Sequence, residues 1–230
     1  MCARIKTIFL LVIFLVVTSC VSHQRVEERA EELPANAWYF DSITFEVAPV
    51  TTAEKPDLDA LDLFRERLHT NHLCHRNSVR FIVHKPTALF QVGPWNTPLL
   101  HHYEARHRTI QDKAPNDRHL FAFIAYIRGP WIDLGGVKLL GGIQYNTTAF
   151  AIFKGGAGNR EAAVLLHEFG HLIGLVKDKD RENHDDDHQY HCANKRCVMF
   201  WSAPRNWSDF DYFCKRDIRR RVIERIVEDD

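Results

Sequence analysis

An apolar segment in the C-terminal half of the chain, residues 160–175, contains two histidines with a glutamate between them. Apolar side chains occupy most sides of the helix that this segment predicts, so the helix belongs in a core. His167 and His171 are four residues apart, which places both imidazoles on one helix face, one turn from each other. Burying these polar groups without partners would cost several kcal/mol, and a shared metal ion removes that cost.

Zinc is the metal that this spacing favours, because two imidazoles one helical turn apart can share one tetrahedral ion. Glu168 follows the first histidine directly. Zinc lowers the pKa of a bound water to about 7, so a neighbouring carboxylate can take its proton at neutral pH. We therefore expect His167 and His171 as metal ligands, and Glu168 as the general base that returns the proton to a leaving amine.

The end of this helix extends the pattern. Gly174 can take a positive φ and end the helix, so that the chain turns back toward the metal. The segment HEFGHLIG, residues 167–174, resembles the metzincin metallopeptidases, whose pattern continues with two residues and then a histidine or aspartate ligand. This chain departs from the pattern there, because Lys177 stands at the third-ligand position and cannot ligate while charged.

A later segment, HCANKRCVM (residues 191–199), is similar to the archaemetzincin signature, in which a histidine precedes Cys-x4-Cys-x-Met. The resemblance implies His191 as the third zinc ligand and Met199 as the methionine of the turn beneath the metal. Residues 175–190 separate Gly174 from His191, where the family has two residues. His184 is the second candidate for the third ligand, and Asp178, Asp185 and His188 stay open behind it.

Four cysteines stand outside the N-terminal segment: Cys74, Cys192, Cys197 and Cys214. The archaemetzincin family uses four cysteines for a second, structural zinc, but here Asp217 stands where the last one would fall. An even number in an exported chain favours disulfides but does not define a unique pairing. Cys192 and Cys197 could close a small disulfide loop, and Cys214 could then pair with Cys74. We therefore do not expect a second, structural zinc. The acidic run at 177–189 lacks an EF-hand pattern, so calcium is not expected either.

The N-terminus reads as an export signal, with a short basic start and an apolar run from Thr7 to Val17 that is too short for a membrane span. Its end, Val17-Thr18-Ser19-Cys20, resembles a bacterial lipobox, which implies cleavage before Cys20 and lipid attachment to its thiol. We expect a signal peptide over 1–19, a lipidated tether over 20–36 and one domain over 37–230. The chain would then be anchored to a bacterial envelope membrane, outside the cytoplasm.

The remaining segments predict an α/β (α+β) fold with a small, mixed, twisted sheet. Strands are expected at 41–47, 79–84, 120–127 and 143–153, and helices at 57–71, 97–111, 160–175 and 215–227. The strand at 143–153 could be an edge strand that pairs with an extended peptide, or an ordinary sheet strand.

Composition excludes one class of partner. The 30 basic and 30 acidic residues cancel, and no basic patch of the kind that binds nucleic acid is present. The expected function is zinc-dependent endopeptidase activity by a monomer on a peptide or protein substrate. The alternative is a zinc-binding envelope lipoprotein without peptidase activity, in which the long segment before His191 plugs the cleft or moves the third ligand away.

Overall fold

The computed structural model describes residue 33 and residues 37–86, 94–110, 118–138, 140–154, 160–177, 183–202 and 209–228. The predicted signal peptide, the lipid-attachment residue Cys20 and nearly all of the tether lie outside these residues. Within the described ranges, no helix has both the length and the apolar character that crossing a lipid bilayer requires.

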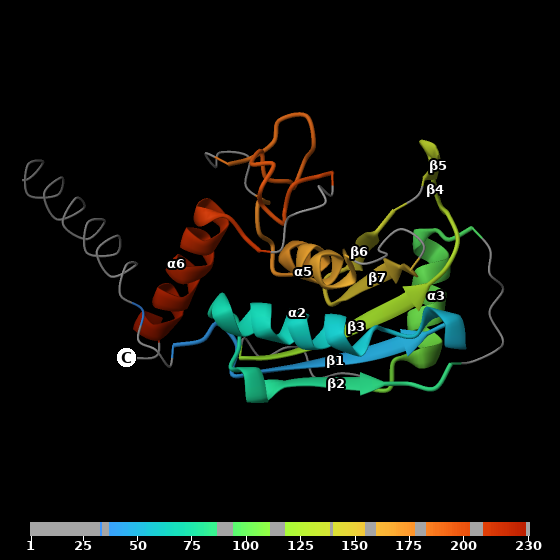
Figure 1. Cartoon of the computed structure of the whole chain (residues 1–230), viewed down its shortest axis with the longest axis horizontal. Coiled ribbons are helices and arrows are strands. Elements are labelled where there is room, and N and C mark those ends of the chain that lie inside the picture. The colour runs from blue at the N-terminus through green and yellow to red at the C-terminus, as the bar shows by residue number, and fades with distance from the viewer. Residues whose placement is uncertain are drawn as a thin grey trace, which may run out of the picture.

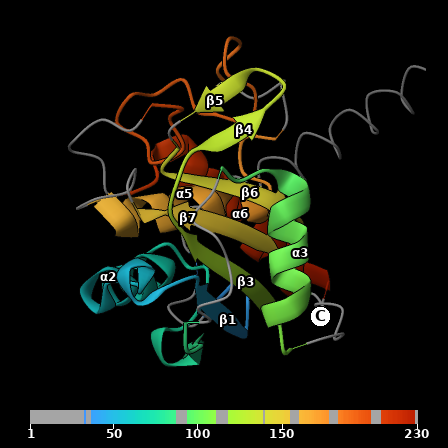
Figure 2. The same cartoon turned by 90° about the vertical axis from the view of Figure 1, so that its right-hand side faces the viewer.

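A twisted five-stranded sheet forms the centre of the molecule, in the order β2-β1-β3-β7-β6 (Figure 1). Neighbouring strands from β2 to β7 run parallel, and β6 at the edge runs antiparallel to β7. The strands are β1 (Ser42–Pro49), β2 (Val79–Val83), β3 (His119–Ile127), β6 (Gly142–Asn146) and β7 (Ala149–Phe153). A short hairpin of β4 (Trp131–Asp133) and β5 (Gly136–Lys138) projects beyond β6 (Figure 2).

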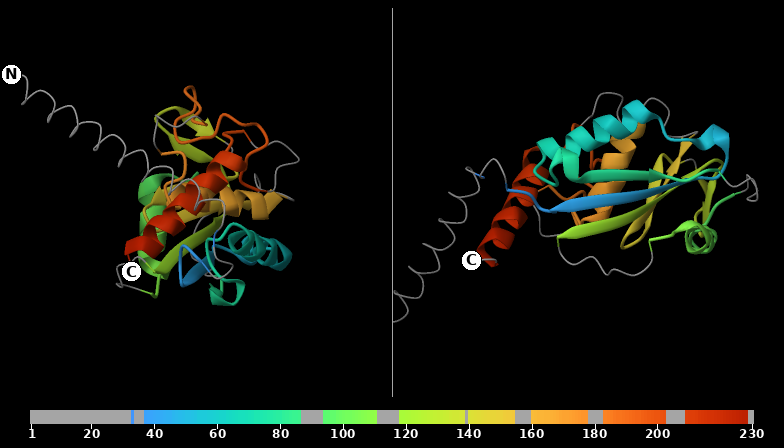
Figure 3. Two further views of the ribbon diagram at one scale, coloured as in Figure 1. Left: turned by 90° about the vertical axis from the view of Figure 1, so that its left-hand side faces the viewer. Right: turned by 90° about the horizontal axis from the view of Figure 1, so that it is seen from below.

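Helices cover both faces of this sheet. Helices α2 (Leu58–Thr70) and α5 (Glu161–Leu172) lie on one face, and α3 (Thr97–His107) lies on the other, as the view from below in Figure 3 shows. Helix α6 (Tyr212–Glu228) crosses one end of the sheet (Figure 1). One apolar core therefore lies between the sheet, α2, α5 and α6, and a second lies under α3. The predicted α/β fold with a small mixed sheet is confirmed.

Local sequence explains the boundaries of α2. Asp57 is its N-cap, and its Oδ1 accepts a hydrogen bond from the N–H of Asp59 at 3.0 Å. Leu61, Phe64 and Leu68 follow at helical spacing and are buried against the sheet. The helix predicted at 57–71 is thus confirmed to within a residue at each end.

One strand prediction was wrong. Residues 143–153 do not form one strand but a hairpin, with β6 and β7 joined by a two-residue turn at Thr147-Thr148. A bulge between Gln144 and Asn146 shifts the register next to this turn. The turn has no glycine or proline, which is why the alternating pattern reads as continuous. The fold makes β6 the edge strand, and it lies directly beside helix α5.

Candidate active site and metal centres

Helix α5 places His167 and His171 at the end of the sheet's edge strand, with their Nε2 atoms 3.0 Å apart. Two nitrogen ligands of one tetrahedral zinc, each at about 2.0–2.1 Å, would be separated by about 3.3 Å. The helix ends just beyond, where the N–H of Gly174 bonds to the His171 carbonyl and the N–H of Leu175 to the Gly170 carbonyl. This is a Schellman motif with Gly174 at a φ of 74°, as the sequence predicted.

Backbone carbonyls fix the tautomer of two histidines. Nδ1 of His167 lies 2.6 Å from the carbonyl oxygen of Val198, and Nδ1 of His191 lies 2.9 Å from that of Gln189. A carbonyl oxygen only accepts, so each Nδ1 must carry the proton and donate it. The Nε2 lone pairs then remain for a metal, with the imidazoles oriented by the backbone, as is usual for metal-bound histidines.

His191 completes the group. One ring nitrogen from each of His167, His171 and His191 lies within 4.8 Å of the others, close enough for one ion. Burial lowers the pKa of His167 to about 4 and holds that of His171 well below its usual value, so both rings are neutral at physiological pH. Neutral imidazole is the form that binds a metal, so the three residues fit a zinc ion.

The other candidates for the third ligand lie outside this group. The side chain of His184 is almost fully buried, and its ring nitrogens form no hydrogen bond within the described residues. His188 stacks on Trp201, with ring centroids 4.0 Å apart, and lies 3.2 Å from a carboxylate oxygen of Asp185. Asp185 also accepts hydrogen bonds from the N–H groups of Asp187 and His188, so it organises the loop. The last candidate, Asp178, lies outside the described residues.

Glu168 is buried on the side of α5 that faces the edge strand β6. Burial raises the pKa of Glu168 to about 8, and a hydrogen bond from the backbone N–H of Gln144 opposes that rise. A carboxyl group with a pKa near neutrality can both take up and release a proton at physiological pH, which suits a general acid/base.

Met199 packs against the backbone of α5 at Gly170, the residue before His171. A Cβ atom added to Gly170 would stand 2.3 Å from the Met199 Sδ atom, so a larger residue there would displace the methionine side chain. The side chain of Met199 is fully buried. The residue that the resemblance singled out as the turn methionine therefore does contact the histidine-bearing helix.

The histidines and Glu168 line a cavity of about 960 Å³. The edge strand contributes Gly142, Ile143 and Gln144 to its wall. Tyr190 and Trp201 also line it, and each is about half exposed. Lys177, Gln189 and Tyr190, which belong to the long segment before His191, therefore form part of the cavity wall.

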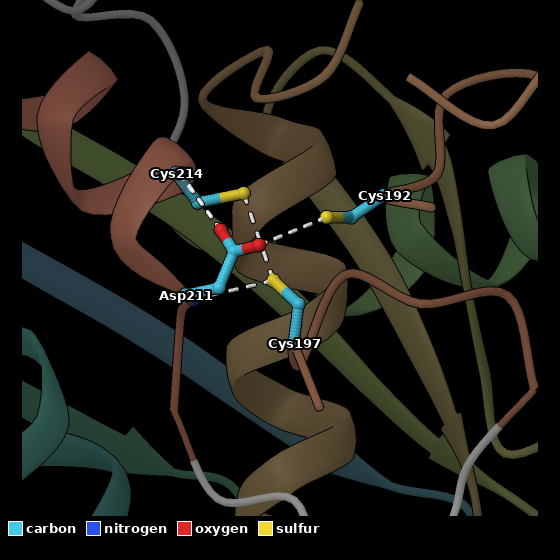
Figure 4. A group of neighbouring side chains, drawn as sticks. All are labelled: Cys192, Cys197, Asp211 and Cys214. Carbon is cyan, nitrogen blue, oxygen red and sulfur yellow. Dashed lines mark hydrogen bonds between the residues drawn. The ribbon is translucent and has the colours of Figure 1, made fainter. Parts of the chain in front are cut away.

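A second group of possible metal ligands, drawn in Figure 4, consists of Cys192, Cys197, Asp211 and Cys214. One ligand atom from each lies within 4.8 Å of the others, and the Sγ atoms of Cys197 and Cys214 are 3.6 Å apart. Tetrahedral zinc with Zn–S bonds of about 2.3 Å would separate two sulfurs by about 3.8 Å. The N–H groups of Met199 and Asp211 both point at the Cys197 sulfur, each at 3.4 Å, which stabilises a thiolate.

This arrangement corrects the disulfide prediction. All four cysteines are free, and Cys214 lies beside Cys197 and Cys192, whereas its predicted partner Cys74 is outside the group. Burial raises the pKa of the Cys74 thiol to about 12, so this side chain is a protonated core residue. An even number of cysteines cannot distinguish disulfides from a metal site, because both bring the sulfurs together.

Asp211 is the residue that sequence reasoning missed. It precedes helix α6, and its Oδ1 accepts a hydrogen bond from the N–H of Cys214 at 2.9 Å, as an N-cap does. Its Oδ2 lies 3.4 Å from the Cys192 sulfur (Figure 4). Asp217 pairs with Arg220 and Arg221. An aspartate before a helix is so common a cap that its sequence position alone did not indicate a ligand.

A buried glutamate anchors the start of the histidine-bearing helix. Glu161 accepts hydrogen bonds from the Tyr126 hydroxyl at 3.0 Å and the Asp57 N–H at 2.9 Å, and it forms an ion pair with Lys154. These contacts join α5 to strand β3, the residue after β7 and the N-terminus of α2. The position of the histidines is thereby tied to the sheet.

Comparisons with known proteins give a likeness in structure but none in sequence. No family model and no curated protein matches the sequence. Among solved structures, the crystal structure of metalloproteinase-II from Bacteroides fragilis matches with a TM-score of 0.46 and 15% identity. The match covers 83% of this chain and 55% of that one. At this identity and TM-score, function has to be inferred from the side chains of this chain.

Proposed function

We propose that this protein is a zinc-dependent endopeptidase whose ion is held by the Nε2 atoms of His167 and His171 and by a ring nitrogen of His191. The observation that carries the proposal is the joint placement of these three neutral imidazoles and a buried carboxyl group in one open cavity. A metal-storage site has no need of a proton-accepting group beside its ligands, so Glu168 favours an enzyme.

When bound, zinc supplies a polarised water molecule and a Lewis acid for a peptide carbonyl. The residues of the chain transfer the proton and orient the ligands. Glu168 takes a proton from the water and later gives it to the leaving amine, a role that its raised pKa supports. The carbonyls of Val198 and Gln189 hold two imidazoles in the tautomer that can ligate.

A peptide or protein substrate can lie along the edge strand β6. This strand has β7 on one side only, and its residues line the cavity beside Glu168. An extended peptide added to such an edge gains backbone hydrogen bonds and comes within reach of the metal centre. We propose this mode of binding for a substrate whose sequence the cavity does not specify.

A second ion at Cys192, Cys197, Cys214 and Asp211 belongs to the same proposal. The three sulfurs and one carboxylate fit a closed, structural zinc site. His191 precedes Cys192, and Met199 is two residues after Cys197. The second ion would therefore hold both ends of the segment that positions the third ligand and the methionine beneath the first ion.

Membrane attachment through Cys20 and an extracytoplasmic location remain a separate proposal from the lipobox-like N-terminus. Replacing Cys20 with serine should move the protein from the membrane fraction to the soluble fraction. Equal partitioning of the variant and the parent protein would contradict the lipid anchor.

The peptidase proposal is tested by hydrolysis of an unstructured protein such as casein, with and without a chelator. We expect cleavage that the chelator stops and added zinc restores. If the zinc-loaded protein cleaves neither casein nor any member of a peptide library, the non-enzymatic alternative, a zinc-binding envelope protein, takes its place.

A further inference from the structure

The edge strand leaves no space for a side chain opposite Glu168. A Cβ atom built on Gly142 would stand 2.6 Å from the Cγ, 2.7 Å from the Oε1 and 2.9 Å from the Cδ of Glu168. All three distances are far shorter than van der Waals contact, and all three atoms belong to the same carboxylate-bearing side chain. Any residue other than glycine at this position would therefore overlap with Glu168.

The glycine is not required by the backbone itself. Gly142 is absent from the residues with positive φ, and it pairs with Ile152 in the regular register of β6 with β7. A residue with a side chain could adopt this conformation without strain. Position 142 requires glycine because the Glu168 side chain occupies the space where a Cβ atom would lie.

Gln144, two residues farther along the same strand, forms a hydrogen bond with Glu168. Its backbone N–H donates a hydrogen bond to the Glu168 carboxylate. Strand β6 therefore positions Glu168 in two ways. Gly142 leaves space for the Glu168 side chain, and the backbone N–H of Gln144 donates a hydrogen bond to its carboxylate. Because β6 also lines the cavity, this contact fixes the carboxylate at the cavity wall.

We propose that Gly142 is a positioning residue for Glu168: the missing side chain admits the carboxylate to the edge strand, and the Gln144 N–H holds it there for proton transfer. This inference rests on the peptidase function proposed above. In this proposal Gly142 acts through Glu168. A misplacement of about 1 Å in a catalytic group can cost about a hundredfold in rate.

The test compares Gly142→Ala with Gly141→Ala. A Cβ atom on Gly141 meets only the Val164 side chain, at 3.2 Å, so this neighbour is a matched control. We expect Gly142→Ala to lower kcat by about 10- to 100-fold with unchanged zinc content, and Gly141→Ala to keep kcat within about threefold. Equal rates in Gly142→Ala and the parent protein would overturn the proposal.

A thermal-unfolding cycle tests the contact without any activity measurement. Gly142→Ala should lower Tm in the parent protein but not in the Glu168→Ala background, because that truncation removes all three overlapping atoms. The double variant should fold even if Gly142→Ala alone does not. The same loss of Tm in both backgrounds would show that the glycine serves the strand and not Glu168. If the parent protein cleaves no peptide, the proposed function fails, and this cycle still reports on the contact.

Discussion

The Sδ atom of Met199 lies against the backbone of Gly170, at a place where any Cβ atom would be only 2.3 Å away. The contact joins the segment after the cysteines to the middle of the histidine-bearing helix. The same segment also contacts this helix at His167, whose Nδ1 lies 2.6 Å from the Val198 carbonyl oxygen.

Replacing Gly170 with alanine should therefore destabilise the protein. In an ordinary helix interior this change gains about 1 kcal/mol, whereas overpacking a core costs about 1–3 kcal/mol. We expect a lower urea midpoint for Gly170→Ala. The loss should largely disappear in a Met199→Ala background, where the overlapping sulfur is gone. A more stable Gly170→Ala protein would show that the close contact does not exist.

The cysteine group predicts a second metal ion. The purified protein should contain two zinc ions per chain by elemental analysis, and Cys214→Ser should contain fewer. Cys74→Ser is the matched control, because Cys74 is an equally buried free thiol outside the group, and it should keep both ions. Unchanged zinc content in Cys214→Ser would contradict the second site.

Loss of the second zinc ion should also weaken the binding of the first zinc ion. His191 and Met199 flank cysteines of the second group in the sequence, so releasing those cysteines frees the segment that carries the third ligand. We expect the zinc that remains in Cys214→Ser to exchange with a colorimetric chelator faster than the corresponding zinc in the parent protein. If the exchange rate of that zinc is unchanged, the two sites are independent.

Glu161 should contribute to stability more than most surface charges do. Its carboxylate is buried and has three partners, Tyr126, Asp57 and Lys154. Removing one member of a buried network typically costs about 3–5 kcal/mol, because the others lose their partner. Glu161→Ala should lower the free energy of unfolding in urea by an amount of this order. Glu161→Gln should lose less, since the amide oxygen can still accept hydrogen bonds. Near-parent stability of Glu161→Ala would contradict the anchoring role.

Sequence predicted the parts of this site that depend on local periodicity. The pairing of His167 with His171 and the turn at Gly174 follow from helix geometry alone. Placing His191 required a resemblance, because the segment between Gly174 and His191 has no periodic pattern. The grouping of Asp211 with three cysteines depends on tertiary contacts, and no local rule distinguishes it from an ordinary helix cap.

In the fold, too, elements with a local sequence pattern were predicted and those without one were missed. The parallel strands β1, β2 and β3 have clear apolar patterns and lie within two residues of their predicted bounds, whereas the helix predicted at 97–111 ends at His107. The hairpin of β6 and β7 was missed because its turn, Thr147-Thr148, lacks the Asn-Gly or Asp-Gly signal that marks two-residue turns. That hairpin turned out to matter, because its edge strand holds Gly142 and Gln144 against Glu168.

Glu168→Gln separates catalysis from metal binding. Glutamine has nearly the same shape as glutamate but cannot accept the proton. We expect hydrolysis to fall by about 10²- to 10⁴-fold, the usual contribution of a general acid/base, while zinc content stays at the level of the parent protein. An active Glu168→Gln protein would assign proton transfer to another group, and loss of zinc would make Glu168 a structural support for the ligands.

The central claim, a three-histidine metal centre, is tested most directly by a crystal structure of the zinc-loaded protein with anomalous scattering recorded at the zinc edge. The predicted result is a peak bonded at about 2.0–2.1 Å to Nε2 of His167, Nε2 of His171 and a ring nitrogen of His191. A peak that lacks His191, or that takes His184 in its place, would contradict this assignment of the site.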